Sequence, residues 1–205
     1  MLIYIIRHGE TKGNVDGYLQ GWSNAALNHN GIKLAVITGQ AMKHIKFDSC
    51  ISSPLIRAKE TAEIILRESG NDILIETDDR IKEINFGDYE LVNTKAAEIK
   101  QFFKNPFQCP QFPGGENVQM VMARTQEFLK ELIERDDDKI YLVVTHGCAL
   151  RAMLNFVYDD KSDYWHGHVP YNCCVNIVEA ENGRAGLIAD DKIYYPADMV
   201  VDRYK

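Results

Sequence analysis

The stretch LIYIIRHGETKGN, residues 2–14, places two basic side chains directly after an unbroken apolar run. The run Leu2–Ile6 is typical of a strand that is buried on both faces of a sheet. It leads without a linker into Arg7, His8 and Gly9. One interpretation is an ordinary loop after a strand. The other is that the strand exists to hold His8 in a fixed position for chemistry.

Further apolar runs predict three more buried strands, at Cys50–Ile51, Ile73–Ile75 and Ile140–Val144. Stretches of helical period lie between them and begin after Asn28, Pro54 and Asn117. The apolar residues that carry this period are Leu34, Ile37, Ala41 and Ile45; Ala58, Ala62 and Ile65; and Val118, Val121, Met122, Phe128 and Leu132. Alternation of strand and helix predicts a parallel sheet covered on both faces. Residues 173–190 add two strands joined at Asn182-Gly183, a strong hairpin signal.

The composition fits one soluble domain of 205 residues, 45% hydrophobic and 26% charged. A net charge of −7 argues against broad binding to nucleic acid or acidic membranes. The five cysteines show no CxxC spacing, which indicates reduced thiols and a cytoplasmic protein. No apolar run approaches the roughly 20 residues of a membrane span. A small anionic substrate remains possible if positive charge gathers locally.

Residues 85–116 depart from the alternating pattern. This stretch holds several phenylalanines among lysines and prolines, and we expect a short helix in an insertion that covers a site as a lid. The alternative is a surface excursion with its own apolar cluster.

Two other segments are also open to interpretation. His166 and His168 resemble a second site but fit a solvated loop better, and the apolar segment 194–205 can dock on the body or on a partner.

Ligands of open α/β sheets gather beyond the carboxyl ends of the strands. Reading only those ends gives Arg7 and His8 after the first strand, Arg57 one turn beyond the second, Glu83 after the third and His146 after the fourth. Each of these residues alone has an ordinary structural explanation. Together they would require several independent coincidences at matched strand ends, so we expect them to form one site.

This set suits phosphoryl transfer through a ring nitrogen. A neutral imidazole can attack phosphorus, while guanidiniums lower its pKa and neutralise the phosphoryl oxygens. A carboxylic acid can protonate the leaving group, and Glu83 competes with Glu90 and Asp88 for that role. Asn14 can add a neutral donor, and glycines at 9 and 147 allow close approach of backbone to phosphate. The arginines supply the positive charge, so the mechanism needs no metal and no cofactor.

Several motifs along nearly the whole chain resemble the histidine phosphatase superfamily, in particular its phosphoglycerate-mutase-like branch. They are RHGET with Asn14, SSPLIRAKET at 52–61, EINFG at 83–87, PGGE at 113–116 and THG at 145–147. The resemblance implies a three-layer α/β/α sandwich with a mostly parallel sheet. It implies His8 as nucleophile, Glu83 as proton donor, and a phosphate pocket of Arg7, Arg57, His146 and Gly147 assisted by Asn14. The stretch QGWSNAAL, 20–27, is similar to the family's loop over the substrate, which implies that Gln20 and Gly21 lie near the site.

Two positions depart from the family pattern. Leu91 stands where the family often has a glycine, and Cys148 stands where a second glycine commonly follows THG. The thiol would lie close to His146, and we therefore consider the hypothesis that oxidation of Cys148 impairs activity.

The sequence favours a phosphatase acting on a small phosphate monoester with a partly apolar leaving group. In this resemblance, mutases carry an arginine pair in the insertion, whereas here it holds only Lys95, Lys100 and Lys104. A cofactor-dependent phosphoglycerate mutase and a non-catalytic phospho-ligand binder remain the alternatives. Cys50 and Arg57 miss the Cys-x5-Arg spacing, and the chain lacks the GxxxxGK[ST] and HExxH motifs. The oligomeric state is not encoded in any motif.

Overall fold

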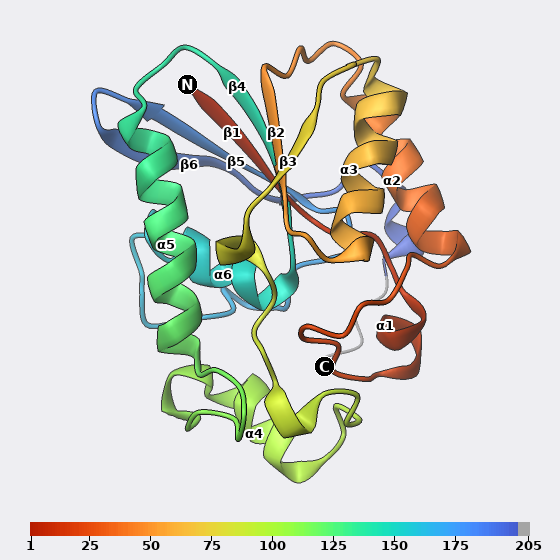
Figure 1. Cartoon of the computed structure of the whole chain (residues 1–205), viewed down its shortest axis with the longest axis vertical. Helices are drawn as coiled ribbons and strands as arrows, with labels where there is room; N and C mark the ends of the chain where they lie inside the picture. The colour runs from red at the N-terminus through yellow and green to blue at the C-terminus, as the bar shows by residue number, and fades with distance from the viewer. Residues whose placement is uncertain (201–205) are drawn as a thin grey trace.

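A mixed sheet of six strands lies at the centre of the molecule within the part of the chain that the computed structural model describes, residues 1–200 (Figure 1). The strand order is β3-β2-β4-β1-β5-β6. The first four strands in this order are mutually parallel, β5 pairs antiparallel with β1, and β6 pairs antiparallel with β5. Their bounds are Leu2–Arg7 for β1, Ser49–Ser52 for β2, Ile75–Thr77 for β3, Ile140–Thr145 for β4, Val175–Glu181 for β5 and Arg184–Lys192 for β6.

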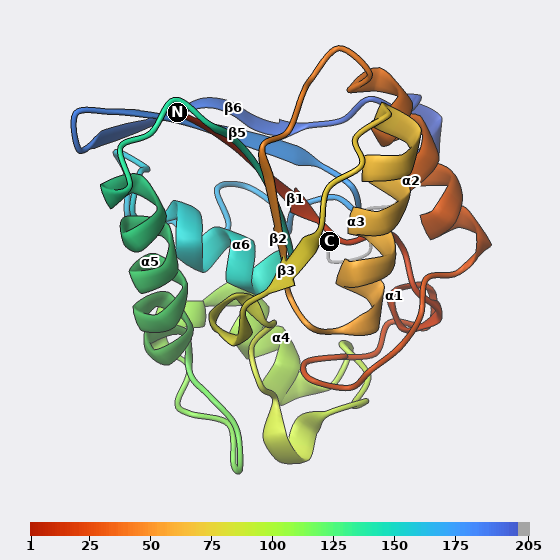
Figure 2. The ribbon, with the colours of Figure 1, turned by 45° about the horizontal axis from the view of Figure 1, so that its top comes forward.

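Helices cover both faces of this sheet. In Figures 1 and 2, α2 and α3 lie on one face and α5 and α6 on the other. The helices are Lys12–Asp16 for α1, His29–Ala41 for α2, Ile56–Ser69 for α3, Ala97–Lys104 for α4, Val118–Glu134 for α5 and Gly147–Leu154 for α6. The predicted α/β/α architecture with a mostly parallel sheet is therefore confirmed.

The packing of strand β1 against helices on both faces of the sheet explains why its sequence is an unbroken apolar run. Ile3 and Ile5 are buried in the cluster that includes α5 and α6, whereas Ile6 is buried in the cluster formed with α3. The predicted N-caps are also confirmed, because the side chain of Asn28 accepts from Gly31 N at 2.7 Å and that of Asn117 accepts from Met120 N at 2.9 Å. Burial on two sides holds the end of β1 rigidly.

The structure differs from the sequence prediction at the bounds of two elements and in one additional helix. The third strand begins at Ile75 rather than Ile73, because it pairs only with β2 at the edge of the sheet, from Cys50↔Ile75 onward. Helix α2 ends at Ala41, so Ile45 lies beyond it and is buried from a turn instead. Helix α6 was not predicted. All eight of its residues are buried, and a helix that is buried all round shows no amphipathic period.

The segment 85–116 lies at the end of the molecule to which the parallel strands point (Figure 1). It contains the expected short helix, α4. Its rings Phe86, Phe102 and Phe112 pack edge to face with centroids 5.1 to 5.8 Å apart. Phe86 and Phe102 also line the pocket described below. The segment therefore has its own apolar cluster and a position beside the candidate site.

The loop that carries His166 and His168 is not the solvated loop that the sequence favours. The ring of His166 stacks on Tyr158 at 3.5 Å between centroids, and His168 Nε2 lies 3.3 Å from a carboxylate oxygen of Asp191. These contacts fix the loop against the body of the protein.

Residues beyond β6 dock on the body through Tyr195, which is buried and donates to Asn172 O at 2.6 Å. The end of the predicted docking segment, 201–205, lies outside the described residues. Across residues 1–200, none of the helices has the length and apolar character that crossing a membrane requires.

Candidate active site

The carboxyl ends of β1, β2 and β4 meet at one edge of the sheet, as the sequence predicts. Arg7 on β1 is in register with Thr145 on β4, and His8 N donates to Thr145 O at 2.9 Å. Ser53, just beyond β2, donates through its backbone to Val144 O at 2.9 Å. The rings of His8 and His146 consequently lie 5.1 Å apart, centroid to centroid.

A pocket of about 460 Å³, measured to its open mouth, lies at this edge. It brings together eight of the nine predicted site residues: Arg7, His8, Asn14, Gln20, Gly21, Arg57, Glu83 and Gly147. The ninth, His146, is completely buried beside His8 and does not line the pocket. The competing carboxylates Glu90 and Asp88 do not line it either.

The imidazole of His8 is neutral and its tautomer is fixed. Burial, and then the charges of Arg57 and Arg7, lower its pKa well below the usual 6.5. Its Nδ1 lies 2.7 Å from Gly9 O. Because a carbonyl oxygen can only accept, Nδ1 carries the proton. The lone pair is therefore on Nε2, which is the nitrogen that can act as a nucleophile.

His146 is also neutral, since burial and then the charge of Arg57 lower its pKa well below 6.5. Its Nε2 lies 2.7 Å from Ser53 Oγ, while its Nδ1 has no hydrogen-bond partner among the described residues. A buried ring nitrogen without a partner is uncommon in a folded protein. Ser53 lies in the motif 52–61, but nothing in the sequence indicates that it holds this ring.

The two arginines are positioned by backbone carbonyls. Arg7 Nη1 donates to Pro170 O, and the buried Arg57 donates through Nη1 to Ser23 O and through Nη2 to Gly21 O, both at 2.7 Å. Arg57 thus joins helix α3 to the loop 20–23. Two guanidiniums beside a neutral imidazole form a site with the charge and geometry that bind a phosphoryl group.

The loop 20–23 is also held by a carboxylate. Glu90 accepts from Trp22 N at 2.9 Å and from Ser23 N at 3.0 Å, and a Cβ on Gly21 would lie 1.7 Å from Glu90 Oε1. Glu90 is therefore occupied in shaping this loop. The indole of Trp22 donates to Glu83 O at 2.8 Å, and the ammonium of Lys82 lies 3.7 Å from its ring centroid.

The carboxylate of Glu83 lies at the N-terminus of helix α6. Its Oε1 accepts from Ala149 N and Ile84 N at 3.0 Å, and its Oε2 accepts from Cys148 N at 3.2 Å. The bonds from Cys148 N and Ala149 N satisfy amides of the first turn of α6, which have no partner within the helix. They also hold the carboxyl group at the wall of the pocket.

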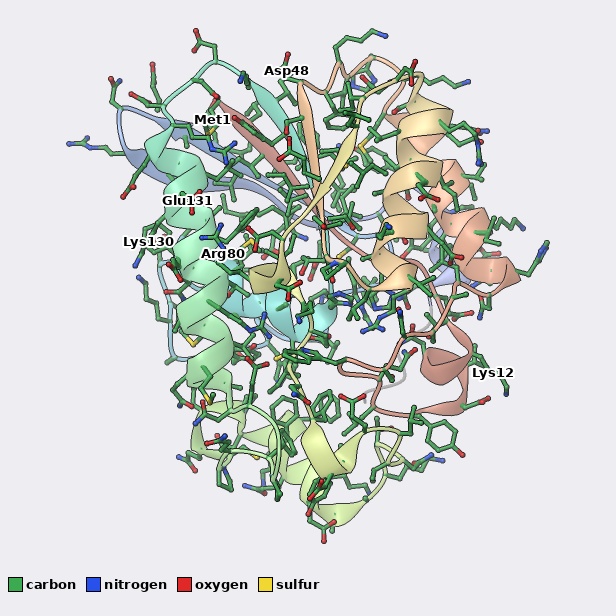
Figure 3. The ribbon with its side chains drawn as sticks, viewed as in Figure 1. Met1, Lys12, Asp48, Arg80, Lys130 and Glu131 are labelled. Atoms are coloured by element: carbon green, nitrogen blue, oxygen red, sulfur yellow. The ribbon has the colours of Figure 1, made fainter. Side chains whose placement is uncertain are left out.

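A second layer of contacts holds the segment that carries Glu83. Arg124 on α5 donates to Arg80 O, Lys82 O and Glu83 O at 2.6 to 2.9 Å and forms an ion pair with Glu116 at 2.8 Å. The side chain of Arg80 in turn reaches Glu131 on α5, with 2.6 Å between the charged atoms (Figure 3). The sequence does not distinguish Arg124 from an ordinary solvated residue, because a charged side chain on a helix usually faces solvent.

The predicted neutral donor Asn14 is oriented by its own helix cap. Its Oδ1 accepts from Thr11 N at 3.1 Å, so the amide Nδ2 is the group that remains to donate into the pocket. Gln20 Oε1 accepts from Thr11 Oγ1 at 2.7 Å. Gly147 lines the pocket as expected, but Gly9 does not. Gly9 is needed for a different reason, because a Cβ there would lie 2.7 Å from Gly31 O.

Cys148 lines the pocket but is held as a thiol. Burial, followed by the charge of Glu83, raises its pKa well above the usual value. Tyr164 donates its hydroxyl hydrogen to Cys148 O at 2.8 Å, so in the second contact, at 2.9 Å, the thiol donates to the phenol oxygen. Because the thiolate is the nucleophile that attacks peroxide, this geometry argues against the hypothesis of an oxidation-sensitive Cys148.

The comparisons with known proteins agree with this geometry. The family model of the histidine phosphatase superfamily (branch 1) matches residues 3–189, and the chain belongs to this family. One relative, the probable phosphoglycerate mutase GpmB of Salmonella choleraesuis (strain SC-B67), is 32% identical over 161 residues, which are 76% of this chain and 74% of the relative.

Solved structures show the same fold. The YhfR protein of Bacillus stearothermophilus is 29% identical, with a TM-score of 0.84 over 94% of this chain and 97% of the other. A phosphoserine phosphatase of Entamoeba histolytica, in complex with 3-phosphoglyceric acid, is 26% identical, with a TM-score of 0.78 over 92% and 95%. The family therefore includes proteins named as phosphatases and proteins named as mutases.

Proposed function

We propose that this protein is a phosphomonoesterase that acts through a covalent phosphohistidine on His8. The observation that carries this proposal is the fixed tautomer of His8, with its proton on Nδ1 toward Gly9 O and its lone pair on Nε2 beside two guanidiniums. A site that only binds phosphate would not need a neutral imidazole there, since a protonated ring would attract phosphate more strongly.

The reaction proceeds in two displacements at phosphorus. His8 Nε2 forms a bond to phosphorus as the ester P–O bond breaks, and protonated Glu83 gives its proton to the departing alkoxide. Glu83 then removes a proton from water, whose oxygen attacks phosphorus and breaks the P–N bond. Inorganic phosphate leaves, and both residues return to their starting states.

The remaining polar groups stabilise charge in the transition state. Arg7 and Arg57 contact the equatorial phosphoryl oxygens, and Asn14 Nδ2 donates to another oxygen. The arginines supply positive charge, so the proposed mechanism is independent of metal.

A cofactor-dependent phosphoglycerate mutase is the second candidate, because the 32% identical relative carries the name of a probable mutase. The pocket favours the phosphatase. Arg7 and Arg57 are the cationic side chains that line it within residues 1–200, and a phosphoglycerate has a carboxylate in addition to its phosphate.

Rapid labelling with an alkaline quench tests the proposal. A substrate with a radioactive phosphoryl group, mixed with the enzyme and quenched, should leave a label on the protein that is acid-labile and alkali-stable. The label and the turnover of p-nitrophenyl phosphate should both disappear in His8→Ala, and turnover should persist in EDTA. A protein that binds phosphate but forms no label would contradict the proposal, and conversion of 3-phosphoglycerate to 2-phosphoglycerate would support the mutase.

A further inference from the structure

The wall of the pocket away from the phosphate cradle is aromatic. Phe102 and Phe103 reach it from α4, and Trp165 reaches it from the loop before β5. Phe86 and Val169 extend the same apolar wall. Two segments that are far apart in the sequence therefore build one surface beside the position of the leaving group.

This aromatic wall is fixed in place by its own packing. The rings of Phe102 and Trp165 meet edge to face with centroids 6.0 Å apart, and Phe103 lies 5.7 Å from Trp165 with 31° between the ring planes. Tyr164 packs edge to face on the other side of Trp165 at 4.9 Å. Phe102 and Trp165 are buried, whereas Phe103 is half-buried and lines the pocket. Phe103 therefore presents ring surface that a ligand can cover.

The charges of the pocket are already matched by one phosphate. Within residues 1–200, the cationic side chains of its lining are Arg7 and Arg57, and Glu83 carries a proton when the substrate binds in the proposed mechanism. A phosphate dianion occupies both guanidiniums. A second anionic group on the substrate would lie against aromatic carbon without a counter-ion, and a buried charge without a partner is strongly unfavourable.

We propose that Phe102, Phe103 and Trp165 form a leaving-group subsite that selects uncharged aromatic groups, so that the substrates are arylalkyl or aryl phosphate monoesters. This inference rests on the proposed phosphatase function and adds the substrate class. An aromatic ring gains both the burial of apolar surface and the edge-to-face or offset contacts that phenylalanine and tryptophan provide. Phosphorylated carboxylates, such as phosphoserine and 3-phosphoglycerate, are disfavoured because residues 1–200 place no further cation in the subsite.

Three substrates that all release an alkoxide test the subsite, because they differ in the body of the leaving group. These are benzyl phosphate, glycerol 3-phosphate and 3-phosphoglycerate. We expect kcat/KM for benzyl phosphate to exceed that for glycerol 3-phosphate by tenfold or more, which corresponds to about 1.4 kcal/mol. We expect 3-phosphoglycerate to be at least tenfold poorer than glycerol 3-phosphate. Equal values for the three substrates would overturn the inference.

Variants of one ring separate recognition from folding. Phe103→Ala should lower kcat/KM for benzyl phosphate about tenfold more than for glycerol 3-phosphate, mainly through KM, and Phe103→Arg should raise the relative activity on 3-phosphoglycerate. Phe107→Ala is the matched control, because Phe107 packs on Tyr164 at 5.4 Å in the same segment and does not line the pocket. It should leave the ratio between substrates unchanged. An equal loss on all substrates in Phe103→Ala would indicate a structural role and contradict the subsite.

The labelling experiment distinguishes failure of the aromatic subsite from failure of the proposed phosphatase function. If phosphohistidine forms and the three esters are hydrolysed alike, the phosphatase assignment stands and the aromatic subsite is wrong. If no ester is hydrolysed and no label forms, the phosphatase assignment fails and the subsite fails with it.

Discussion

Lowering the pH should destabilise this protein through two buried histidines. The pKa values of His8 and His146 are both lowered well below 6.5, first by burial and then by neighbouring positive charge. Well above pH 6.5 neither the folded nor the unfolded chain protonates these rings, so their contribution to stability is complete there. As the pH falls, the unfolded chain binds protons that the folded chain does not, and the free energy of unfolding decreases.

The magnitude follows from proton linkage. With an unfolded pKa of about 6.5 and a folded ring that stays neutral, each histidine removes about 1.4 kcal/mol of stability between pH 7.5 and 5.5, so the pair removes about 3 kcal/mol. Urea unfolding followed by far-ultraviolet circular dichroism at the two pH values measures this loss. His146→Gln should reduce it by about 1.4 kcal/mol, because one of the two proton sites is removed from the unfolded chain.

The exposed His44 provides the control. His44→Gln removes an imidazole outside the pocket, and the loss of stability between pH 7.5 and 5.5 should match that of the parent. The reasoning is refuted if His146→Gln loses as much stability as the parent over this range. That result would mean that the buried ring is already protonated in the folded protein at pH 5.5, despite the arginines beside it.

Three further predictions concern single side chains. Glu83→Gln should slow hydrolysis of benzyl phosphate by roughly 10²-fold or more. It should slow hydrolysis of p-nitrophenyl phosphate far less, because a good leaving group needs little protonation. Arg124→Gln should show the same difference between the two substrates, but more weakly. Leu91 is exposed and has a φ of +62°, a backbone conformation that favours glycine. Leu91→Gly should therefore raise the free energy of unfolding by about 1 kcal/mol. Leu74 is exposed without a positive φ, so the control Leu74→Gly should lower the free energy of unfolding. Cys148→Ala and the parent should lose activity equally in peroxide, and a protected variant would show that the thiol is reactive.

The sequence predicted the strand ends well because their signals are local. Each parallel strand is an apolar run, and the rule that sites lie beyond carboxyl ends then selects Arg7, His8 and His146 without further information. The caps at Asn28 and Asn117 are local as well, since each depends on one side chain and one backbone amide three residues away.

Other features depend on contacts between distant segments. Arg124 holds the backbone of residues 80–83 from another helix, and Trp165 enters the pocket from a loop that the sequence suggested was solvated. Neither position has a spacing or composition that distinguishes it from an ordinary surface residue. Glu90 illustrates the same limit, since it competes with Glu83 in the sequence, and the structure separates the two because Glu83 lines the pocket whereas Glu90 is bonded to the loop 20–23.

The positions of the two tryptophans give the protein built-in optical probes. Trp165 lines the pocket, and Trp22 belongs to the loop whose carbonyls occupy Arg57. A phosphate in the pocket lies beside Trp165, and a phosphate that contacts Arg57 contacts the side chain that is bonded to the loop of Trp22. The intrinsic fluorescence of the unlabelled enzyme should therefore report occupancy in real time, and Trp22→Phe would assign the emission change to the loop or to the pocket wall.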